Sequence, residues 1–279
     1  MTKSFVHLHA HTEYSMLDGA AKIVDYLKKV KELNQPAAAI TDHGNLYGAM
    51  EFVQKANDLG IKPIIGYEAY ITPGSRFDRP DRENNKRYHL TLLAENNIGY
   101  QNLVELVSKA YTEGYYYKPR IDYELLEQHH DGLIALSGCL GGELAQHLAP
   151  DGSVEEGNTS NERSFEKALE VAKKYQSIFG KNNYFIEIHN HGIKQQLDIL
   201  DDLVEIAELI DAPLVAANDS HYVEENGAEA HDALLCVQTN RTLDDESRFR
   251  FDGSGYYVKS SEEMRKLFPQ DKYPDACDN

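Results

Sequence analysis

The chain is poor in cysteine. Its three cysteines, Cys139, Cys236 and Cys277, lie far apart among 279 residues and form no CxxC pair. This spacing predicts no disulfide framework and favours the reducing cytoplasm over secretion. It also leaves each thiol available as a metal ligand.

The chain also lacks a long apolar segment. No run approaches the roughly 18 residues that a membrane-spanning helix needs, and residues 1–5 show no signal-peptide pattern. We therefore expect a cytoplasmic protein without membrane association. A hydrophobic share of 41% suits one large domain, so residues 1–279 are predicted to form a single domain. Residues 271–279 show neither a capped helix nor a tail, as expected if the chain belongs to a longer protein.

Positive charge is scarce as well. The chain has 28 Lys and Arg against 46 Asp and Glu, a formal net charge of −18. Taken alone, this argues against a nucleic-acid surface, because phosphate contacts need Lys and Arg. Bound divalent cations would reverse the sign locally, because they outweigh the negative charge of a few anionic ligands.

Histidine is concentrated at the start of the chain. The run FVHLHAH places His7, His9 and His11 at alternate positions, which in a β-strand puts all three imidazoles on one face. Neutral imidazole is the commonest metal ligand in proteins. An isolated HxH pattern is a weak signal, however, and His7 lies deeper along the segment. We interpret His7 as a hydrogen-bonded core residue.

Short apolar runs alternate with amphipathic stretches along the chain. Strands are predicted at residues 5–11, 37–41, 63–71, 88–94, 133–137, 184–188 and 214–217, and helices at 20–33, 46–59, 101–111, 164–179, 193–210 and 228–236. The strands are too apolar to have a solvent-exposed face. The pattern predicts a parallel sheet covered by helices, either a barrel or a doubly wound sheet.

Functional groups in such folds gather at the carboxyl ends of the strands. Nine ligand-type side chains lie at or near these ends: His9, His11, Asp18, His43, Glu68, His89, Cys139, Asp219 and His221. His89 fits less well, because it lies at the start of its predicted strand. Mixed nitrogen, oxygen and sulfur donors suit zinc, or manganese and iron at the oxygen-rich positions. Cys139 alone would be a small buried hydrophobe, and only its position in this pattern makes it a candidate ligand.

The motifs HLHAH, TDHGN, GYEAY, YHLTLLAEN, SGC and NDSHY follow one another in this order, with Asp18 between the first two. Together they resemble the polymerase-and-histidinol-phosphatase (PHP) domain. The resemblance is closest to the amino-terminal PHP domain of bacterial replicative polymerases of the DNA polymerase III alpha family, and it runs from residue 5 to residue 278. It implies a distorted seven-stranded β/α barrel of the TIM type. It also implies that the chain is the amino-terminal part of a longer polymerase.

The resemblance assigns all nine side chains to the family's metal-ligand positions. It places His9, His11, Glu68 and Asp219 around one ion, Glu68, His89 and Cys139 around a second, and Asp18, His43 and His221 around a third. The ions implied are three divalent metals, zinc and/or manganese, with iron as a further option. The implied activity is a 3′→5′ proofreading exonuclease or phosphoesterase. A metal-bound hydroxide is the expected nucleophile, so no side chain is expected to act as one.

Two other functions remain open. One is a non-catalytic, metal-stabilised module that braces the polymerase, and the other is a free-standing phosphomonoesterase like the histidinol phosphatases. The expected partners are the 3′ end of primer-template DNA, the remainder of the polymerase chain and the replisome.

Four residues are candidate DNA contacts. Tyr116, Lys118 and Arg120 mix aromatic and cationic groups as a stacking platform for single-stranded DNA does. Arg87 ends a polar, partly basic loop that leads to His89. The competing interpretations are packing of the first three against the rest of the polymerase and an ordinary charged surface loop for Arg87.

Further polar residues lie close to the candidate ligands in the sequence. His189 and His191 imitate a second HxH, but the family pattern has no ligand there, so we interpret them as loop histidines or as groups behind the ligands. Asp42 either orients a ligand imidazole or is an ordinary loop carboxylate.

Overall fold

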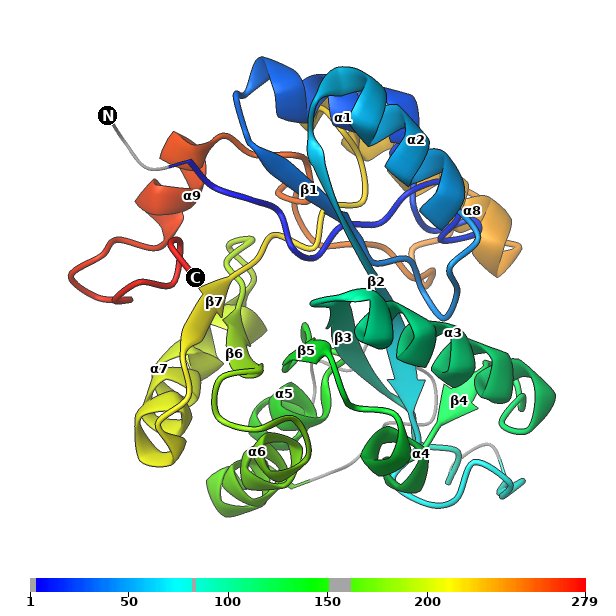
Figure 1. The fold of residues 1–279 in the computed structure, drawn as a ribbon. Helices are drawn as coiled ribbons and strands as arrows, with labels where there is room; N and C mark the ends of the chain where they lie inside the picture. The colour runs from blue at the N-terminus through cyan, green and yellow to red at the C-terminus, as the bar shows by residue number, and fades with distance from the viewer. Residues whose placement is uncertain (1–3, 82–83, 151–161) are drawn as a thin grey trace.

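The computed structural model describes residues 4–81, 84–150 and 162–279. Its centre is a curled sheet of seven strands (Figure 1). The strands are β1 (Ala37–Ile40), β2 (Lys62–Ile71), β3 (Tyr88–Ala94), β4 (Arg120–Ile121), β5 (Leu133–Leu136), β6 (Tyr184–Ile188) and β7 (Leu214–Ala216). The main path through the sheet is β1-β2-β3-β5-β6-β7, and β4 pairs with β2. The prediction of a distorted seven-stranded α/β barrel is confirmed in the form of this curled half-barrel.

The sheet is mixed, so the prediction of a wholly parallel sheet is wrong. β3 runs antiparallel to both of its neighbours, β2 and β5, whereas the remaining strand pairs are parallel. A parallel return requires a crossover, usually a helix, and the described residues between β2 and β3 contain none. Both strands are largely buried, and an apolar pattern of this kind does not reveal strand direction.

The segment predicted as the first strand, residues 5–11, forms no regular strand. It lies between the two ends of the curled sheet (Figure 1, dark blue) and bonds to both. On one side Ala39 N and Thr41 N donate to carbonyl groups of residues 7 and 10. On the other side His11 N donates to Ser220 O at 2.8 Å, and Ser220 N donates back to His9 O at 3.3 Å. This segment therefore links the β1 edge to the chain that follows β7.

All six predicted helices are present, with shifted ends: α1 (Ile23–Glu32), α2 (Ala49–Leu59), α3 (Asn97–Thr112), α6 (Phe165–Phe179), α7 (Lys194–Ile210) and α8 (Ala228–Thr239). The apolar pattern did not reveal α4 (Tyr123–Gln128), α5 (Glu143–Leu148), α9 (Ser261–Leu267) or the 3₁₀ turn η2 (Glu225–Gly227). These elements span too few residues to show a helical period.

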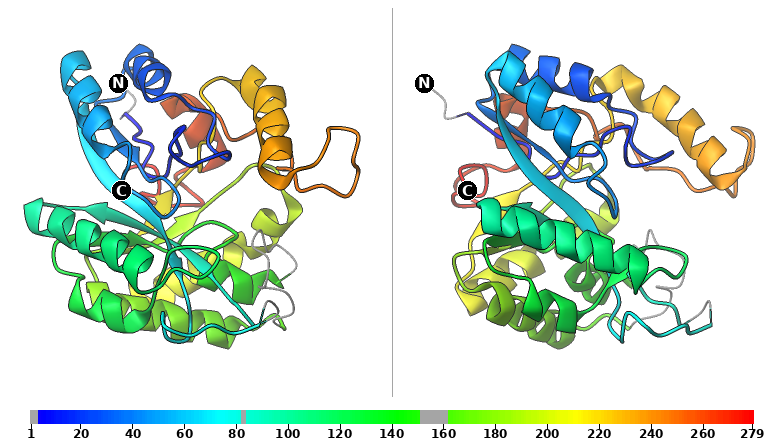
Figure 2. Two further views of the ribbon diagram at one scale, coloured as in Figure 1. Left: turned by 90° about the vertical axis from the view of Figure 1, so that its right-hand side faces the viewer. Right: turned by 45° about the vertical axis from the view of Figure 1, so that its right-hand side comes forward.

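The helices cover the outer face of the sheet in two groups (Figure 2). α1 and α2 pack with β1 around Tyr26, Leu27 and Phe52. The larger core lies between β2, β3, β5 and β6 and the helices α3, α5, α6 and α7. Among the described residues, no helix is both long and apolar enough to cross a bilayer.

Candidate metal centre

The nine predicted ligands converge at one end of the curled sheet. His9 and His11 come from the linking segment, Glu68 from β2 and His89 from β3. The others lie in the loops that follow the linking segment, β1, β5 and β7, and are Asp18, His43, Cys139, Asp219 and His221. Each of the nine lies within 4 Å of at least one other member through a side-chain nitrogen, oxygen or sulfur atom.

Glu68 lies in the middle of this group and is 1% exposed. Its Oε1 atom is 3.3 Å from His9 Nε2, 3.0 Å from His89 Nδ1 and 3.8 Å from Cys139 Sγ. Its Oε2 atom is 2.6 Å from His43 Nδ1 and 3.6 Å from His11 Nε2. The two oxygens therefore face different donors, which is the arrangement that a bridging carboxylate requires.

Two aspartates complete the acidic part of the group. Asp219 Oδ1 lies 3.4 Å from His9 Nε2 and 3.2 Å from His11 Nε2. Asp18 Oδ2 lies 2.7 Å from His43 Nε2 and 3.8 Å from His221 Nε2. The backbone of Asp219 has a φ of 45°, in the left-handed region that Asp tolerates better than most residues. Such strained residues cluster at functional sites.

The protonated nitrogen of His11 can be assigned from its hydrogen bonds. Ser15 Oγ donates its one hydrogen to Asp42 Oδ1 at 2.7 Å. His11 Nδ1, 2.8 Å from Ser15 Oγ, must therefore be the donor in that contact. The lone pair of His11 then lies on Nε2 and points at Asp219. Asp42 thus acts on His11 through Ser15, and this favours an orienting role over the alternative of an ordinary loop carboxylate.

The same logic applies to two further imidazoles. His9 Nδ1 lies 2.7 Å from Glu187 Oε1, and His221 Nδ1 lies 2.8 Å from the carbonyl oxygen of Asp219. Both acceptors lack a hydrogen, so each Nδ1 donates. Their Nε2 lone pairs are thereby directed into the group of candidate ligands, as in metal sites whose imidazoles are oriented from behind by a carboxylate or carbonyl.

Several of these inward-facing atoms are buried without a hydrogen-bond partner among the described residues. They are His9 Nε2, His11 Nε2, His221 Nε2, Glu68 Oε2 and Asp219 Oδ1. Lone pairs and carboxylate oxygens that face each other out of water are unfavourable unless a cation lies between them. The donor set therefore fits divalent metal.

Ligand atoms within 4.8 Å of one another form three groups from the predicted set: His9 with His11 and Asp219, His11 with His43 and His221, and His43 with Glu68 and His89. A fourth group joins His9 to Glu187 and His189. Imidazole and carboxylate donors in such groups suit zinc and manganese.

The pKa shifts within the group have opposite signs. At His9 and His221 the neighbouring carboxylates outweigh burial and raise the pKa, so a metal would bind there by replacing a proton on Nε2. Burial, together with the nearby imidazoles of His43 and His221, lowers the pKa of His11 to about 3, so its ring stays neutral. Burial and the carboxylates of Glu68 and Asp219 raise the pKa of the Cys139 thiol. A Cys139 thiolate therefore needs a neighbouring cation at neutral pH.

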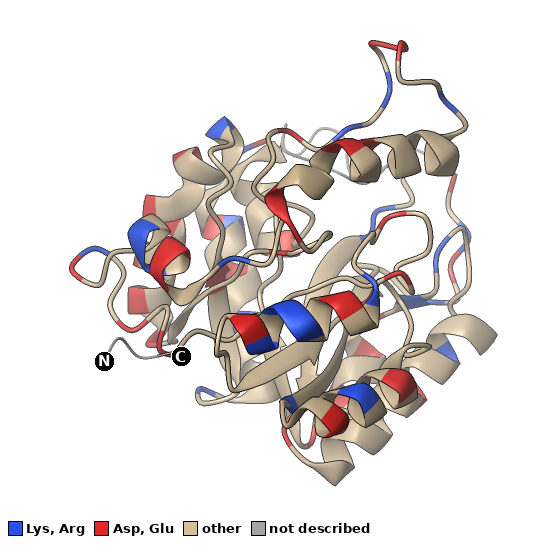
Figure 3. Cartoon of the chain, turned by 90° about the horizontal axis from the view of Figure 1, so that it is seen from above, with Lys and Arg blue, Asp and Glu red and all other residues tan. Residues whose placement is uncertain are grey.

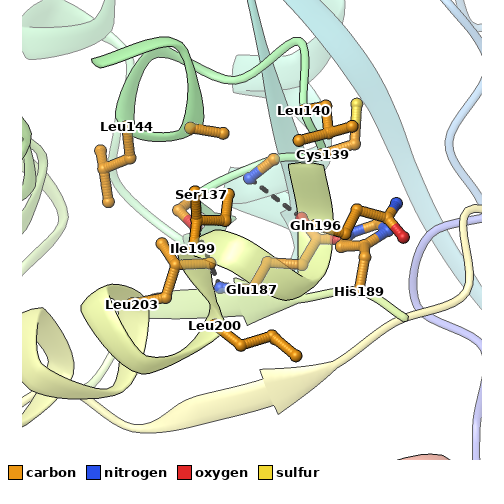
Figure 4. A pocket seen from close by; sticks show the side chains of 12 residues that line it. Ser137, Cys139, Leu140, Leu144, Glu187, His189, Gln196, Ile199, Leu200 and Leu203 are labelled. Atoms are coloured by element: carbon orange, nitrogen blue, oxygen red, sulfur yellow. Dashed lines mark hydrogen bonds and ion pairs between the residues drawn. The ribbon is translucent and has the colours of Figure 1, made fainter. Parts of the chain in front are cut away.

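Glu187 is a functional residue that the sequence pattern did not reveal. This residue is the fourth of the five in β6 and is 1% exposed, and its carboxylate contacts His9 Nδ1 at 2.7 Å and His189 Nε2 at 2.9 Å. Gly138 N donates to its other oxygen at 3.0 Å, as the dashed line in Figure 4 shows. The sequence did contain a signal, an acidic residue inside the apolar run YFIEI. An acid in such a run is expected to be buried, and a buried carboxylate must have polar partners.

His7 and His191 have structural contacts instead and belong to none of these ligand groups. His7 is buried and its Nε2 lies 2.9 Å from Lys259 O, which agrees with the core role predicted for it. His191 Nε2 lies 2.9 Å from Asn218 O, and its ring stacks on Tyr256 with centroids 3.9 Å apart.

Six of the nine candidate ligands line the floor of a cleft of about 810 Å³: Asp18, His43, His89, Cys139, Asp219 and His221. The other three, His9, His11 and Glu68, are buried next to them. Its lining includes five basic residues, Arg87, Lys118, Arg241, Arg248 and Arg250, against three acidic ones, Asp18, Asp219 and Asp252. Two of these acids belong to the candidate centre. Basic charge is thus concentrated at the cleft although the chain as a whole is acidic. Figure 3 shows some of it on the loop that follows α8.

The four candidate DNA contacts fall into two classes. Arg87 and Lys118 line the cleft, whereas Tyr116 and Arg120 are not among its lining residues. The Tyr116 hydroxyl donates to Pro80 O at 2.8 Å, and its ring faces the Arg120 guanidinium at 5.2 Å. This aromatic and cationic pair is therefore stacked within the protein.

Arg120 is buried, and this contradicts its prediction as a DNA contact. Its guanidinium donates to four acceptors: Gly114 O, Arg76 O, Asp78 O and Asn85 Oδ1. A side chain with no exposed surface cannot reach a DNA backbone. Arg120 instead ties the loop after β2 to the end of α3, which sequence pattern alone could not show.

The fold and the donor set together define a PHP-type α/β protein. The family model described as PHP domain matches residues 7–191, and the chain belongs to this family. It is 49% identical over 275 residues to DNA polymerase III subunit alpha of Thermus aquaticus, with 97% of this chain and 22% of that protein covered. The same subunit of Mycobacterium tuberculosis strain H37Rv is 47% identical over 290 residues, covering 99% of this chain and 23% of that protein.

The subunit of Treponema pallidum is 46% identical over 277 residues, covering 99% of this chain and 22% of that protein. The chain thus spans about a fifth of the length of these curated relatives. Among solved structures, an amidohydrolase from Chromobacterium violaceum has a TM-score of 0.41 and 15% identity, covering 78% of this chain and 88% of that chain.

Proposed function

We propose that this chain hydrolyses phosphodiesters as a 3′→5′ proofreading exonuclease module of a bacterial replicative DNA polymerase. In this proposal residues 1–279 are a single domain, the amino-terminal part of the polymerase, and work in the cytoplasm. The observation that carries the proposal is the cluster of unpartnered Nε2 and carboxylate atoms at the floor of a cleft with a basic wall. Such a cluster fits divalent metal, and such a wall fits a phosphate backbone.

The proposed ligands are His9, His11, Asp18, His43, Glu68, His89, Cys139, Asp219 and His221, around three ions of zinc and/or manganese. Divalent ions bound there would acidify water and neutralise charge that develops on the phosphate. The protein's own part is to fix the tautomer of His9 and His11 that carries its hydrogen on Nδ1 and presents Nε2 as the ligand atom, through Glu187 and Ser15. Arg87 and Lys118 attract the phosphate backbone of primer DNA. No side chain acts as the nucleophile.

The test combines metal analysis with an exonuclease assay on matched and mismatched primer termini, with and without Mn²⁺. The variants are His9→Ala and Asp219→Asn. Matched controls are His130→Ala and Asp131→Asn, because both side chains are exposed and outside the candidate centre. We expect the wild type and the two controls to bind three metal equivalents and to hydrolyse the primer terminus. In the two ligand variants, both the metal content and the rate of hydrolysis should be lower. Hydrolysis at the wild-type rate by His9→Ala would refute the assignment.

The same experiment separates the other two functions. The melting temperature of a purely structural module would fall on chelation, and the module would have no nuclease activity with or without metal. A phosphomonoesterase would cleave small phosphate monoesters in preference to primer DNA.

A further inference from the structure

The segment that follows α8 forms one wall of the cleft. It leaves the body of the domain as the orange loop in Figure 2 and returns along residues 248–252. Arg248 anchors the return, because its buried guanidinium pairs with both carboxylate oxygens of Asp232 on α8. A bidentate pair of this kind fixes orientation as well as distance. The residues next to Arg248 are therefore presented to the cleft in a defined position.

A row of aromatic rings runs along this wall from the candidate metal centre outward. The Phe251 ring lies 4.8 Å from that of His221 and 4.6 Å from that of Tyr256. Phe249 follows, with its ring centroid 5.7 Å from that of Phe251. Phe249 is 37% exposed and lines the cleft. Exposed aromatic rings beside a basic groove are what single-stranded nucleic acids stack on.

The arginines of this wall differ in what they bind. Arg248 is paired with Asp232, and Arg241 with Asp245 at 3.2 Å. Arg250 also lines the cleft but is exposed, and it makes no ion pair within the described parts of the chain. Its planar guanidinium is therefore available for a ligand, and the group it matches best in size and charge is a phosphate.

We propose that Phe249 and Arg250 form a nucleotide subsite, in which Phe249 stacks on the base of a single-stranded 3′ end and Arg250 pairs with a phosphate. This inference rests on the proposed function and specifies its substrate class as a nucleic-acid end rather than a small phosphate ester. Phe251 supports Phe249 from behind and connects it to His221. In this subsite the base lies against the loop wall, and the phosphodiester lies at the floor of the cleft, beside the candidate metal centre.

Binding tests this subsite without any turnover. The 279-residue chain, loaded with Mn²⁺, is titrated with labelled oligothymidine whose linkages are hydrolysis-resistant phosphorothioates and, separately, with inorganic phosphate. We expect Phe249→Ala to weaken oligothymidine binding about tenfold, the effect of removing one stacking platform. Arg250→Gln should reduce the slope of log affinity against log salt by about 0.7, the value for one phosphate contact on a single strand. Leu243→Ala is the matched control, because Leu243 is an exposed apolar residue of the same loop that does not line the cleft.

An abasic 3′ terminus isolates the stacking contact. The wild type should prefer a terminus with a base about tenfold over an abasic one, and this ratio should fall to about one in Phe249→Ala. A ratio that is the same in both proteins would overturn the stacking role. An unchanged salt slope in Arg250→Gln would overturn the phosphate contact.

The outcomes also distinguish this proposal from the function on which it rests. Binding that depends on Phe249 without any terminal hydrolysis would refute the exonuclease and retain the subsite. Terminal hydrolysis with no dependence on Phe249 or Arg250 would refute the subsite and retain the exonuclease, and would mark the loop as a packing surface for the rest of the polymerase.

Discussion

Glu187 Oε1 lies 2.7 Å from His9 Nδ1, on the side of the imidazole that faces away from Glu68 and Asp219. Both side chains are buried, and Gly138 N and His189 hold the carboxylate in place. The contact fixes the tautomer of His9 and increases the basicity of its inward nitrogen. Glu187 therefore acts on a metal through His9, as a positioning residue.

Replacement of Glu187 should weaken metal binding more than it weakens the fold. We expect Glu187→Gln to lower metal affinity by about 10–100-fold, because an amide is a poorer acceptor and does not fix the tautomer as firmly. Competition with a chromophoric chelator measures this affinity. Glu170→Gln, at an exposed position on α6, is the control. Equal affinities in the two variants would show that Glu187 only fills space.

Chelation should destabilise the chain. The unpartnered lone pairs of the candidate centre repel one another when no cation lies between them, so a bound metal stabilises only the folded state. At metal concentrations one hundred times the dissociation constant, the stabilisation is about 2.7 kcal/mol. Thermal unfolding with and without EDTA, followed by re-addition of Zn²⁺ or Mn²⁺, measures it. A melting temperature that EDTA leaves unchanged contradicts the presence of such a centre.

The stability of the chain should also depend on Glu143, which lies outside the centre. Burial raises the pKa of this carboxyl, although the hydroxyls of Tyr123 and Tyr175 oppose the shift by donating to it. Between the unfolded pKa of about 4.5 and the raised folded pKa, the folded state binds more protons than the unfolded state. The contribution of Glu143 to the free energy of unfolding is therefore fully present below pH 4.5 and decreases as the pH rises through the folded pKa.

Glu143→Gln removes this pH dependence, because glutamine does not ionise. The variant should gain stability relative to wild type as the pH rises from 5 to 8, as measured by urea unfolding at several pH values. Glu170→Gln serves as the control here too. A constant difference between Glu143→Gln and wild type across that range would show that the carboxyl does not titrate with a raised pKa.

Substitution of Arg120 should lower the stability of the chain much more than substitution of Lys118, although only two positions separate them. Arg120→Met leaves four acceptors without their donor, three of them in buried bonds, and we expect it to lower the free energy of unfolding by about 3 kcal/mol. Lys118, at the cleft, bonds to the Tyr70 hydroxyl, and Lys118→Met should change stability by less than about 1 kcal/mol. Urea unfolding separates the two, and a mild effect of Arg120→Met would restore it as a candidate DNA contact.

Sequence pattern predicted six of the seven strands and the long helices, because their apolar runs are long enough to recognise, but it missed the two-residue strand β4. It placed β3 and β6 at their observed residues, 88–94 and 184–188. It did not reveal that β3 runs antiparallel, because a strand buried on both faces has the same composition in either direction. It also predicted a strand for the linking segment, whose backbone bonds to two neighbours at only a few points.

The positions of the candidate ligands could be predicted because histidine, acid and cysteine recur where apolar runs end. What lies behind those ligands could not be predicted. Ser15, Asp42 and Glu187 act through contacts between residues distant in sequence, and these depend on the tertiary fold. Arg120 was predicted to contact DNA but is buried, because an aromatic and basic run has the same composition whether it faces solvent or the interior.

The position of the linking segment in the chain determines when, during synthesis, the candidate metal centre can form. His9 and His11 are made well before their proposed partners Asp219 and His221, which follow β7. The site cannot be complete until β7 and the loop after it have been made. Capture of metal therefore follows the synthesis of residue 221, and a nascent chain stalled before residue 219 would expose its early histidines without the acid that is to share their ion.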